Sequence, residues 1–247
     1  MSVTKKLKEV DKKYPLKRVN KLIDNLIMIV GITCMFLGTY CLLDNYNVYN
    51  QVTRTQKLGF RSEVSENSIT FSDVPLAKAW LTIPDTQVNY PIMQGKDNLE
   101  YINKDCFGKY SLSGSIFADF QNKSDFTDKY NLLYGHHMDN GGMYGDVMEY
   151  INKDYFDKHL TGNLFMPDGR ARKMEVFACI ECDAYDRMIY QVEGKKGHIM
   201  ELVEYLKKHS TNFRDIGLKE SDQIMSLSTC VSLETNGRVV LFARVNP

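Results

Sequence analysis

Three short segments of the sequence carry side chains that could together perform acyl transfer. Cys230 follows the alternating run IMSLST, His136 follows Gly135 in YGHHM, and Arg238 opens the run GRVV. A cysteine supplies a nucleophile, a histidine a proton shuttle, and an arginine a positive donor that cannot lose its charge beside an oxyanion. Taken singly, a buried structural cysteine, a satisfied histidine and a solvated arginine are the commoner interpretations. In combination, at the ends of β-rich runs, the three predict a catalytic site.

The elements that must position these residues are short β-strands. β-rich runs separated by breakers such as Pro84-Asp85 and Pro167-Asp168-Gly169 cover residues 79–83, 87–93, 114–120, 131–134, 163–166, 173–182, 223–229 and 238–245. Helical patterns interrupt them at residues 143–150 and, with apolar positions at helical spacing, at residues 195–209. Eight strands with turns between them predict a mainly β fold, a closed or nearly closed barrel with the second helix inserted before the cysteine strand.

The amino-terminal part has a different composition. Residues 26–43 contain no charged residue, and residues 1–21 carry a net charge of +6 in a chain whose 31 basic and 31 acidic residues balance. A bilayer core needs about 20 apolar residues in a helix, and a basic flank stays in the cytoplasm. We expect a cytoplasmic tail over residues 1–21, a membrane anchor over 22–43, a helical extension over 44–75 and the barrel over 76–247. A cleaved signal peptide and a buried helix of a cytosolic protein are the alternatives.

Composition and cysteine spacing argue against several other classes of protein. The zero charge balance lacks the basic footprint of a dedicated nucleic-acid binder. Cys179 and Cys182 have C-x-x-C spacing but lie in a strand-like run without a second ligand pair, which disfavours a zinc or redox site. Zinc held by His136, His137 and Cys230 is disfavoured because adjacent side chains in an extended segment point in opposite directions. We therefore expect neither a metal nor a cofactor.

From about residue 44 to residue 247 the sequence resembles the sortases, membrane-anchored cysteine transpeptidases of Gram-positive bacteria, and among them class B. The motifs that carry the resemblance are WLTIPDTQVNYPIMQGKDNLEYI, GSIFADFQN, NLLYGHHMDNGGMYGDV, LSTC and GRVVLFARV. The resemblance implies an eight-stranded sortase-type β-barrel with amino-terminal helices and a long helix before the cysteine strand. That helix lies in a loop that forms a wall of the peptide groove in the family.

The resemblance also assigns roles to individual residues. Cys230 is implied as the nucleophile, His136 as the catalytic histidine and Arg238 as the residue that stabilises the oxyanion or orients substrate, whereas His137 has no catalytic role. Arg244, a second arginine on the same predicted strand, is the weaker alternative to Arg238. The positions that match substrate-binding sites of the groove are Asn98, Ile102, Ser228 and Thr229.

The implied reaction is a transpeptidation outside the cell. The enzyme would cleave the C-terminal sorting motif of a secreted protein after a Thr and join the acyl group to a cell-wall peptide amine or to a pilin Lys. One alternative is a cell-wall cysteine peptidase that uses water as acceptor. The papain-like group places its cysteine before its histidine, whereas here His136 precedes Cys230. A non-catalytic barrel that binds peptide is the other alternative.

Overall fold

The computed structural model describes residues 3–57, 70–138, 141–195, 198–230 and 236–246. Two compact units, Met1–Asn47 and Val48–Pro247, are described separately below. Helix α1 runs from Val3 to Lys57. Within it, the stretch Leu16–Asn50 is long and apolar enough, by length and composition, to cross a membrane, and its most apolar window is not buried. A helix apolar on all sides and uncovered by protein suits a lipid environment. The boundaries predicted for the tail, the anchor and the extension stay predictions, and residues 58–69 of the extension lie outside the described residues.

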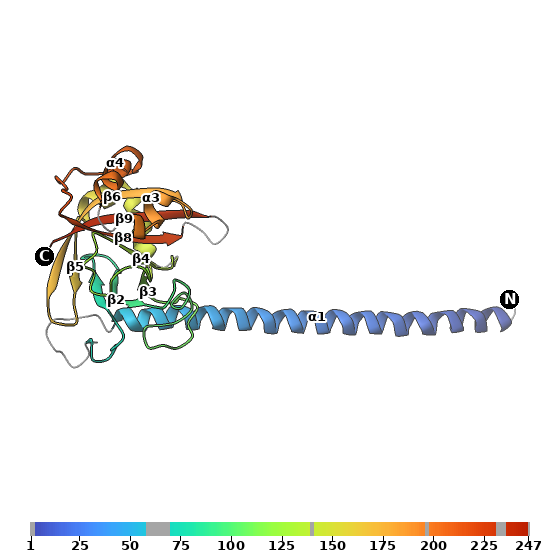
Figure 1. Ribbon diagram of the computed structural model, residues 1–247. Helices are drawn as coiled ribbons and strands as arrows, with labels where there is room; N and C mark the ends of the chain where they lie inside the picture. The colour runs from blue at the N-terminus through green and yellow to red at the C-terminus, as the bar shows by residue number, and fades with distance from the viewer. Residues whose placement is uncertain (1–2, 58–69, 139–140, 196–197, 231–235, 247) are drawn as a thin grey trace. The chain divides into compact units, whose positions relative to one another are not determined.

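The second unit is built around a closed β-barrel (Figure 1). Hydrogen-bonded neighbours follow the order β5-β1-β2-β3-β4-β8-β9-β6, and β6 pairs again with β5, so that eight strands form a ring. The pairs β2–β3 and β4–β8 are parallel, and the other pairs are antiparallel. The strands of the ring are β1 Ala79–Thr82, β2 Asn89–Gln94, β3 Ile116–Ala118, β4 Tyr130–Tyr134, β5 Thr161–Phe165, β6 Ala171–Asp183, β8 Gln223–Cys230 and β9 Gly237–Val245.

This ring confirms the predicted eight-stranded barrel, since each predicted β-rich run overlaps one of its strands. The described residues add a ninth strand, β7 (Asn212–Phe213), which pairs with β6 and was not predicted because two residues carry no periodicity. The closing strand β6 contains an irregularity between Val176 and Ala178. Such a bulge bends a strand, which allows β6 to pair with β9 and also with β5.

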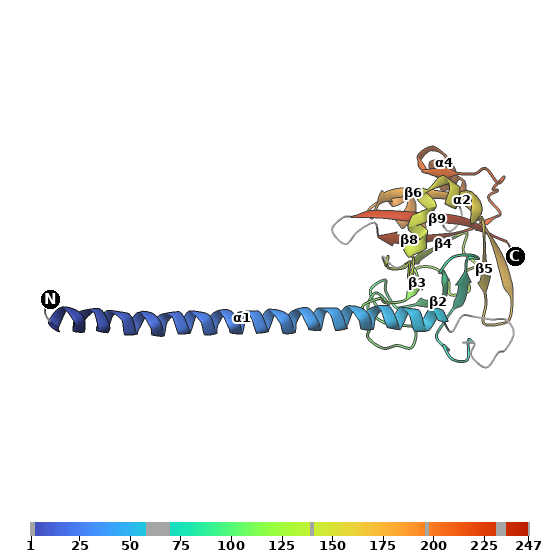
Figure 2. The ribbon, with the colours of Figure 1, turned by 180° about the vertical axis from the view of Figure 1, so that it is seen from behind.

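The barrel core is apolar and is closed by two short helices, visible from behind in Figure 2. These are the 3-10 helix η1 (Gly145–Ile151) and α2 (Lys153–Lys158), which contribute Val147, Tyr150 and Phe156 to the core. The helix predicted over residues 143–150 is therefore a 3-10 helix, and α2 was not predicted. The Asn212 amide donates to the carbonyl oxygens of Tyr150 and Ile151, at 2.9 and 2.8 Å, and so ties η1 to β7.

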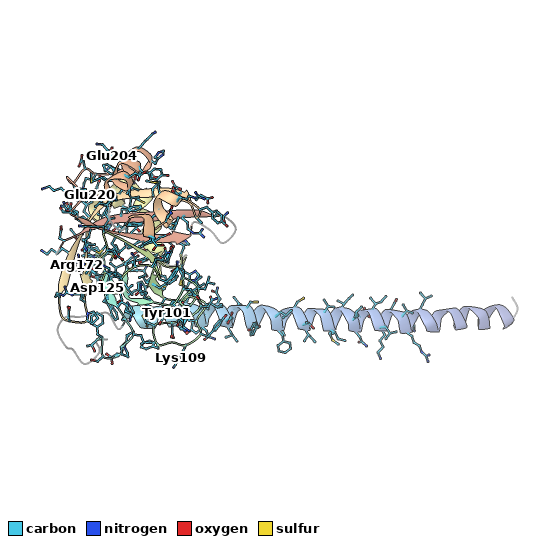
Figure 3. The ribbon with its side chains drawn as sticks, viewed as in Figure 1. Tyr101, Lys109, Asp125, Arg172, Glu204 and Glu220 are labelled. Atoms are coloured by element: carbon cyan, nitrogen blue, oxygen red, sulfur yellow. The ribbon has the colours of Figure 1, made fainter. Side chains whose placement is uncertain are left out.

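A second apolar cluster joins two helices to the outer face of β4, β6, β8 and β9 (Figure 1). The helices are α3 (Arg187–Tyr190) and α4 (Met200–His209), and the 3-10 helix η2 (Glu193–Lys195) lies between them in the chain. The predicted helix over 195–209 thus begins at Met200. Its first backbone N–H groups are satisfied by the Glu220 carboxylate, which accepts from Ile199 at 3.1 Å and Met200 at 3.3 Å. Figure 3 labels Glu220 beside this helix.

The third cluster covers β1, β2 and β3 on the side of the loop between β2 and β3. Trp80 is its largest buried side chain, and its indole N–H donates to Asn89 Oδ1 at 2.7 Å. Tyr101, labelled in Figure 3, and Cys106 pack from the loop onto the strands. Burial of these two loop residues holds the segment from Asn98 to Ile102, which contains Tyr101, against the barrel.

Candidate active site

The backbone brings the predicted nucleophile and the predicted arginine together across one strand pair. Cys230 is the last residue of β8 and lies opposite Arg238, near the start of β9, in the antiparallel register. Opposite residues in such a pair have Cα atoms about 4.5–5.5 Å apart. On its other side Arg238 lies opposite Cys182 of β6. The antiparallel pairing of β8 with β9 therefore brings these two predicted site residues together.

The predicted histidine reaches the same edge of the sheet through the parallel pair β4–β8. Tyr134 lies opposite Ser228, and the Gly135 N–H donates to the Ser228 carbonyl oxygen at 3.1 Å. Parallel strands end at the same edge, so His136, two residues beyond Tyr134, lies beside the end of β8. The His136 carbonyl oxygen in turn accepts from the Tyr144 N–H at 2.9 Å. The backbone on both sides of the imidazole is thus tied to the barrel.

Gly135 is required by close packing. An ideal Cβ at this position would lie 2.4 Å from Ile116 Cδ1 and 2.6 Å from Tyr144 Cδ2. Real Cβ atoms do not approach other atoms so closely, and both neighbours are buried in the barrel core. The absence of a side chain at Gly135 therefore lets β4 end against the core just before His136.

One hydrogen bond sets the orientation of the imidazole. His136 Nε2 lies 2.9 Å from the carbonyl oxygen of Ile102. A carbonyl oxygen only accepts, so Nε2 carries the hydrogen in this arrangement, and in the neutral ring Nδ1 is the basic nitrogen. The resemblance predicted Ile102 as a groove residue, and its backbone carbonyl also holds the histidine.

A groove of about 330 Å³ lies at this edge of the sheet, and six of the seven predicted site residues line it. They are Asn98, Ile102, His136, Ser228, Thr229 and Arg238. The seventh, Cys230, follows Thr229 directly in β8. The groove thus unites segments from the β2–β3 loop, the end of β4, and the facing ends of β8 and β9.

The aromatic wall of this groove was not predicted from the sequence. Tyr134 packs against Phe117 and Tyr190, with ring centroids 5.3 and 6.4 Å away, and all three residues line the groove together with Gly135 and Ala184. The Tyr190 hydroxyl lies 2.8 Å from Ser228 Oγ. Tyr134 could have been found from its place before the GHH motif, but no local pattern marks Phe117, Ala184 or Tyr190.

The polar residues of the groove differ in how they are held. Asn98 Nδ2 donates to Asp119 Oδ2 at 2.8 Å, and Asn98 Oδ1 accepts from the Phe120 N–H at 3.0 Å. The Thr229 side chain is buried, and its Oγ1 finds no hydrogen-bond partner among the residues that the structure describes. The Arg238 Nη1 donates to the Gly237 carbonyl oxygen at 2.9 Å and the residue is partly exposed.

The structure separates the two candidate arginines. Arg244 lies opposite Ile224, at the other end of the β8–β9 pair from Cys230. Its guanidinium forms an ion pair with Glu175 and approaches Asp222 at 3.8 Å. Arg244 therefore serves an ion-pair network and does not line the groove, whereas Arg238 does.

The remaining cysteines of the barrel unit lack the features of reactive thiols. Burial raises the pKa of Cys106, Cys179 and Cys182 to about 12. Cys179 and Cys182 lie on strand β6, as the sequence predicted for this C-x-x-C pair. Over the described part of the chain, no group of three or more His, Cys, Asp or Glu residues could hold a metal ion.

Comparison with known proteins places this arrangement in a family. No family model matches the chain. The chain is 33% identical to sortase B of Listeria monocytogenes over 154 residues. These residues make up 61% of this chain, and they span only 61% of the length of that relative. A class B sortase of Streptococcus pyogenes that is involved in pilus biogenesis is 36% identical, with a TM-score of 0.67 over 72% of this chain and 98% of that chain. A Staphylococcus aureus sortase B–substrate complex is 28% identical, with a TM-score of 0.62 over 69% of this chain and 79% of that chain. Because identity with the streptococcal enzyme extends over nearly its whole solved structure, the chain belongs to the class B sortases.

Proposed function

We propose that this protein is a cysteine transpeptidase that cleaves a C-terminal sorting motif after a Thr and joins the acyl group to an amine. The observation that carries the proposal is the meeting of three segments at one groove: the end of β8 with Cys230, the start of β9 with Arg238, and the end of β4 with His136. Membership of the class B sortases supports the same reaction.

In the proposed first half-reaction, the Cys230 sulfur attacks the Thr carbonyl carbon of the bound peptide. His136 Nδ1 takes the proton of the Cys230 thiol, a C–S bond forms, the peptide C–N bond breaks, and Nδ1 passes that proton to the departing amine. Arg238 stabilises the oxyanion because its guanidinium keeps its charge and offers several donors in one plane. Since Nε2 is bonded to the Ile102 carbonyl, Nδ1 is the nitrogen that moves the proton.

In the second half-reaction the acceptor amine replaces the cysteine. His136 Nδ1 takes a proton from the incoming amino group, a new C–N bond forms, and the C–S bond breaks to release Cys230. The proposed acceptors are the amine of a peptidoglycan precursor or a pilin Lys. The involvement of the streptococcal relative in pilus biogenesis supports the second acceptor. No step requires a metal or a cofactor.

The proposed location follows from the amino-terminal helix. With residues 1–21 in the cytoplasm and residues 22–43 in the bilayer, residues 44–75 and the catalytic domain over 76–247 lie outside the cell. The secreted protein that bears the sorting signal and a lipid-linked amine would both start at the outer leaflet. Tethering the enzyme there raises the effective concentration of both substrates at the active site.

The test is direct detection of the thioacyl intermediate. The full chain in detergent micelles is mixed with a sorting-type peptide and an amine acceptor, and products are identified by mass spectrometry. We expect an acyl adduct on Cys230 and an amide product from the parent enzyme. The Cys230→Ala variant should give neither, and the His136→Ala variant should give almost none of either. Release of free acid alone would identify a peptidase, and absence of any adduct across a panel of sorting peptides would identify a peptide-binding barrel.

A further inference from the structure

A buried carboxylate lies directly behind the groove. Asp119 follows strand β3 and is only 3% exposed. Its Oδ2 accepts from Asn98 Nδ2 at 2.8 Å and from the Tyr134 hydroxyl at 2.9 Å, while its Oδ1 accepts from the Gln121 N–H at 2.9 Å. Asn98 and Tyr134 both line the groove, whereas Asp119 does not. One carboxylate is thus the shared partner of two groove side chains that come from distant segments.

The chemistry of these bonds leaves Asn98 only one orientation of its amide. An ionised carboxylate only accepts and a backbone N–H only donates, so Nδ2 must face Asp119 and Oδ1 must face the Phe120 N–H. The amide then retains one N–H and one lone pair. A peptide bond needs a donor for its carbonyl oxygen and an acceptor for its N–H, and this amide can offer both.

The bond to Tyr134 restrains the aromatic wall. Burial, together with the nearby Asp119 carboxylate, raises the pKa of the Tyr134 hydroxyl, so Tyr134 keeps its proton and remains a donor. The ring is held at its hydroxyl by Asp119 and packs against the rings of Phe117 and Tyr190. Asp119 therefore contacts the two groove side chains at the points that determine their orientation.

We propose that Asp119 is a positioning residue for peptide recognition, which fixes the Asn98 amide and the Tyr134 ring in the orientation that binds the backbone of the sorting peptide. This inference rests on the proposed function. It assigns Asp119 no contact with substrate and no part in bond making.

The variant that tests it is Asp119→Asn, which keeps the size of the side chain. One of its two terminal atoms becomes an NH2 group, and that group must face either the Gln121 N–H or the two donors Asn98 and Tyr134. Both placements put donors against donors. The matched control is Asp128→Asn, because Asp128 is a buried carboxylate of similar exposure that accepts from Asn122 and Lys123, neither of which lines the groove.

Two readouts are measured on the full chain in detergent. With active enzyme, we expect Asp119→Asn to lower kcat/KM for the sorting peptide about tenfold, and Asp128→Asn to leave it within about twofold. In a Cys230→Ala background, peptide affinity measured by calorimetry falls by a similar factor for Asp119→Asn only. Because Asp119 acts in part through Asn98, the double variant with Asn98→Ala loses less than the product of the two single losses.

The outcomes separate the inference from the proposed reaction. Weakened peptide binding without any acyl adduct in the parent enzyme would support the role of Asp119 and refute transpeptidation. Equal effects of Asp119→Asn and Asp128→Asn, or multiplicative losses in the double variant, would overturn the role of Asp119. A parent chain that neither binds nor cleaves sorting peptides would overturn both.

A second variant is used should Asp119→Asn fail to fold. Asn98→Asp sets a carboxylate against Asp119 and must lower kcat/KM more than Asn98→Ala does. An equal loss in these two variants refutes the inference.

Discussion

Replacement of Gly135 by Ala tests whether His136 is positioned by close packing of the backbone in front of it. The added methyl group would lie 2.4 Å from Ile116 Cδ1 and 2.6 Å from Tyr144 Cδ2. Ile116 is 1% exposed and Tyr144 is 0% exposed, so neither side chain has open space into which it can move. The strain must therefore shift the backbone of Gly135 and His136 or distort the barrel core.

The expected size of the effect follows from this geometry. Overpacking of a well-filled core costs about 1–3 kcal/mol in the free energy of unfolding. For a unit of this size each kcal/mol lowers Tm by about 2–4 °C, so we expect a fall of about 2–12 °C. If the backbone shift moves the His136 imidazole by about 1 Å, kcat/KM for the sorting peptide falls by about 100-fold.

The assay combines thermal unfolding followed by circular dichroism with peptide turnover, both on the full chain. Gly194→Ala is the matched control, because a Cβ there meets only Gln191, at ordinary distances of 3.8–3.9 Å. It should change neither Tm nor turnover appreciably. If Gly135→Ala were as stable and as active as the parent, the close approach of β4 to the core would not position the histidine, and our account of Gly135 would be refuted.

Three further predictions address other residues of the barrel unit. Arg238→Lys should lower kcat/KM about 100-fold without a change in Tm. Arg244→Lys disturbs the ion pair with Glu175, so it should cost about 1 kcal/mol of stability and leave turnover unchanged. If kinetics and thermal melts gave the reverse pattern, Arg244 would be the catalytic arginine. Tyr190→Phe and Ser228→Ala each remove one partner of a 2.8 Å hydrogen bond. A double-mutant cycle in urea unfolding should therefore give a coupling free energy of about 1 kcal/mol. A coupling near zero would show that the bond contributes nothing to stability. Alkylation of Cys106, Cys179 and Cys182 by iodoacetamide at pH 8 should be about 1000-fold slower in the folded chain than in urea, because a pKa raised from 9.0 to about 12 lowers the thiolate fraction. The rates should increase as the pH rises toward 12. Equal rates in both states, measured by mass spectrometry, would contradict the burial of Cys106 and Cys179 and the partial burial of Cys182.

Much of the fold could be predicted from the sequence because its strands have local signatures. Runs of β-branched and aromatic residues bounded by Gly, Pro, Asn and Asp report the backbone preference and burial of each segment by itself, and each predicted run overlaps a strand of the barrel. The uncharged run over residues 26–43 likewise predicts an apolar helix from composition alone. Elements without such signatures were missed or misplaced: β7 has two residues, and the start of α4 coincides with capping by Glu220, which is distant in the sequence.

By itself, the sequence determined the types of the functional residues and the strand ends that carry them: Cys230 at the end of one run, Arg238 at the start of the next, His136 just beyond a third. Only the tertiary structure decided which residues meet. The parallel pairing of β4 with β8 brings His136 to the groove, and the partners of Arg244 hold it away from the groove, at the other end of the β8–β9 pair. Asp119 acquires its place only when the β2–β3 loop and the end of β4 converge on it. Local patterns depend on near neighbours in the chain, whereas these contacts join distant segments and exist only once the barrel has closed.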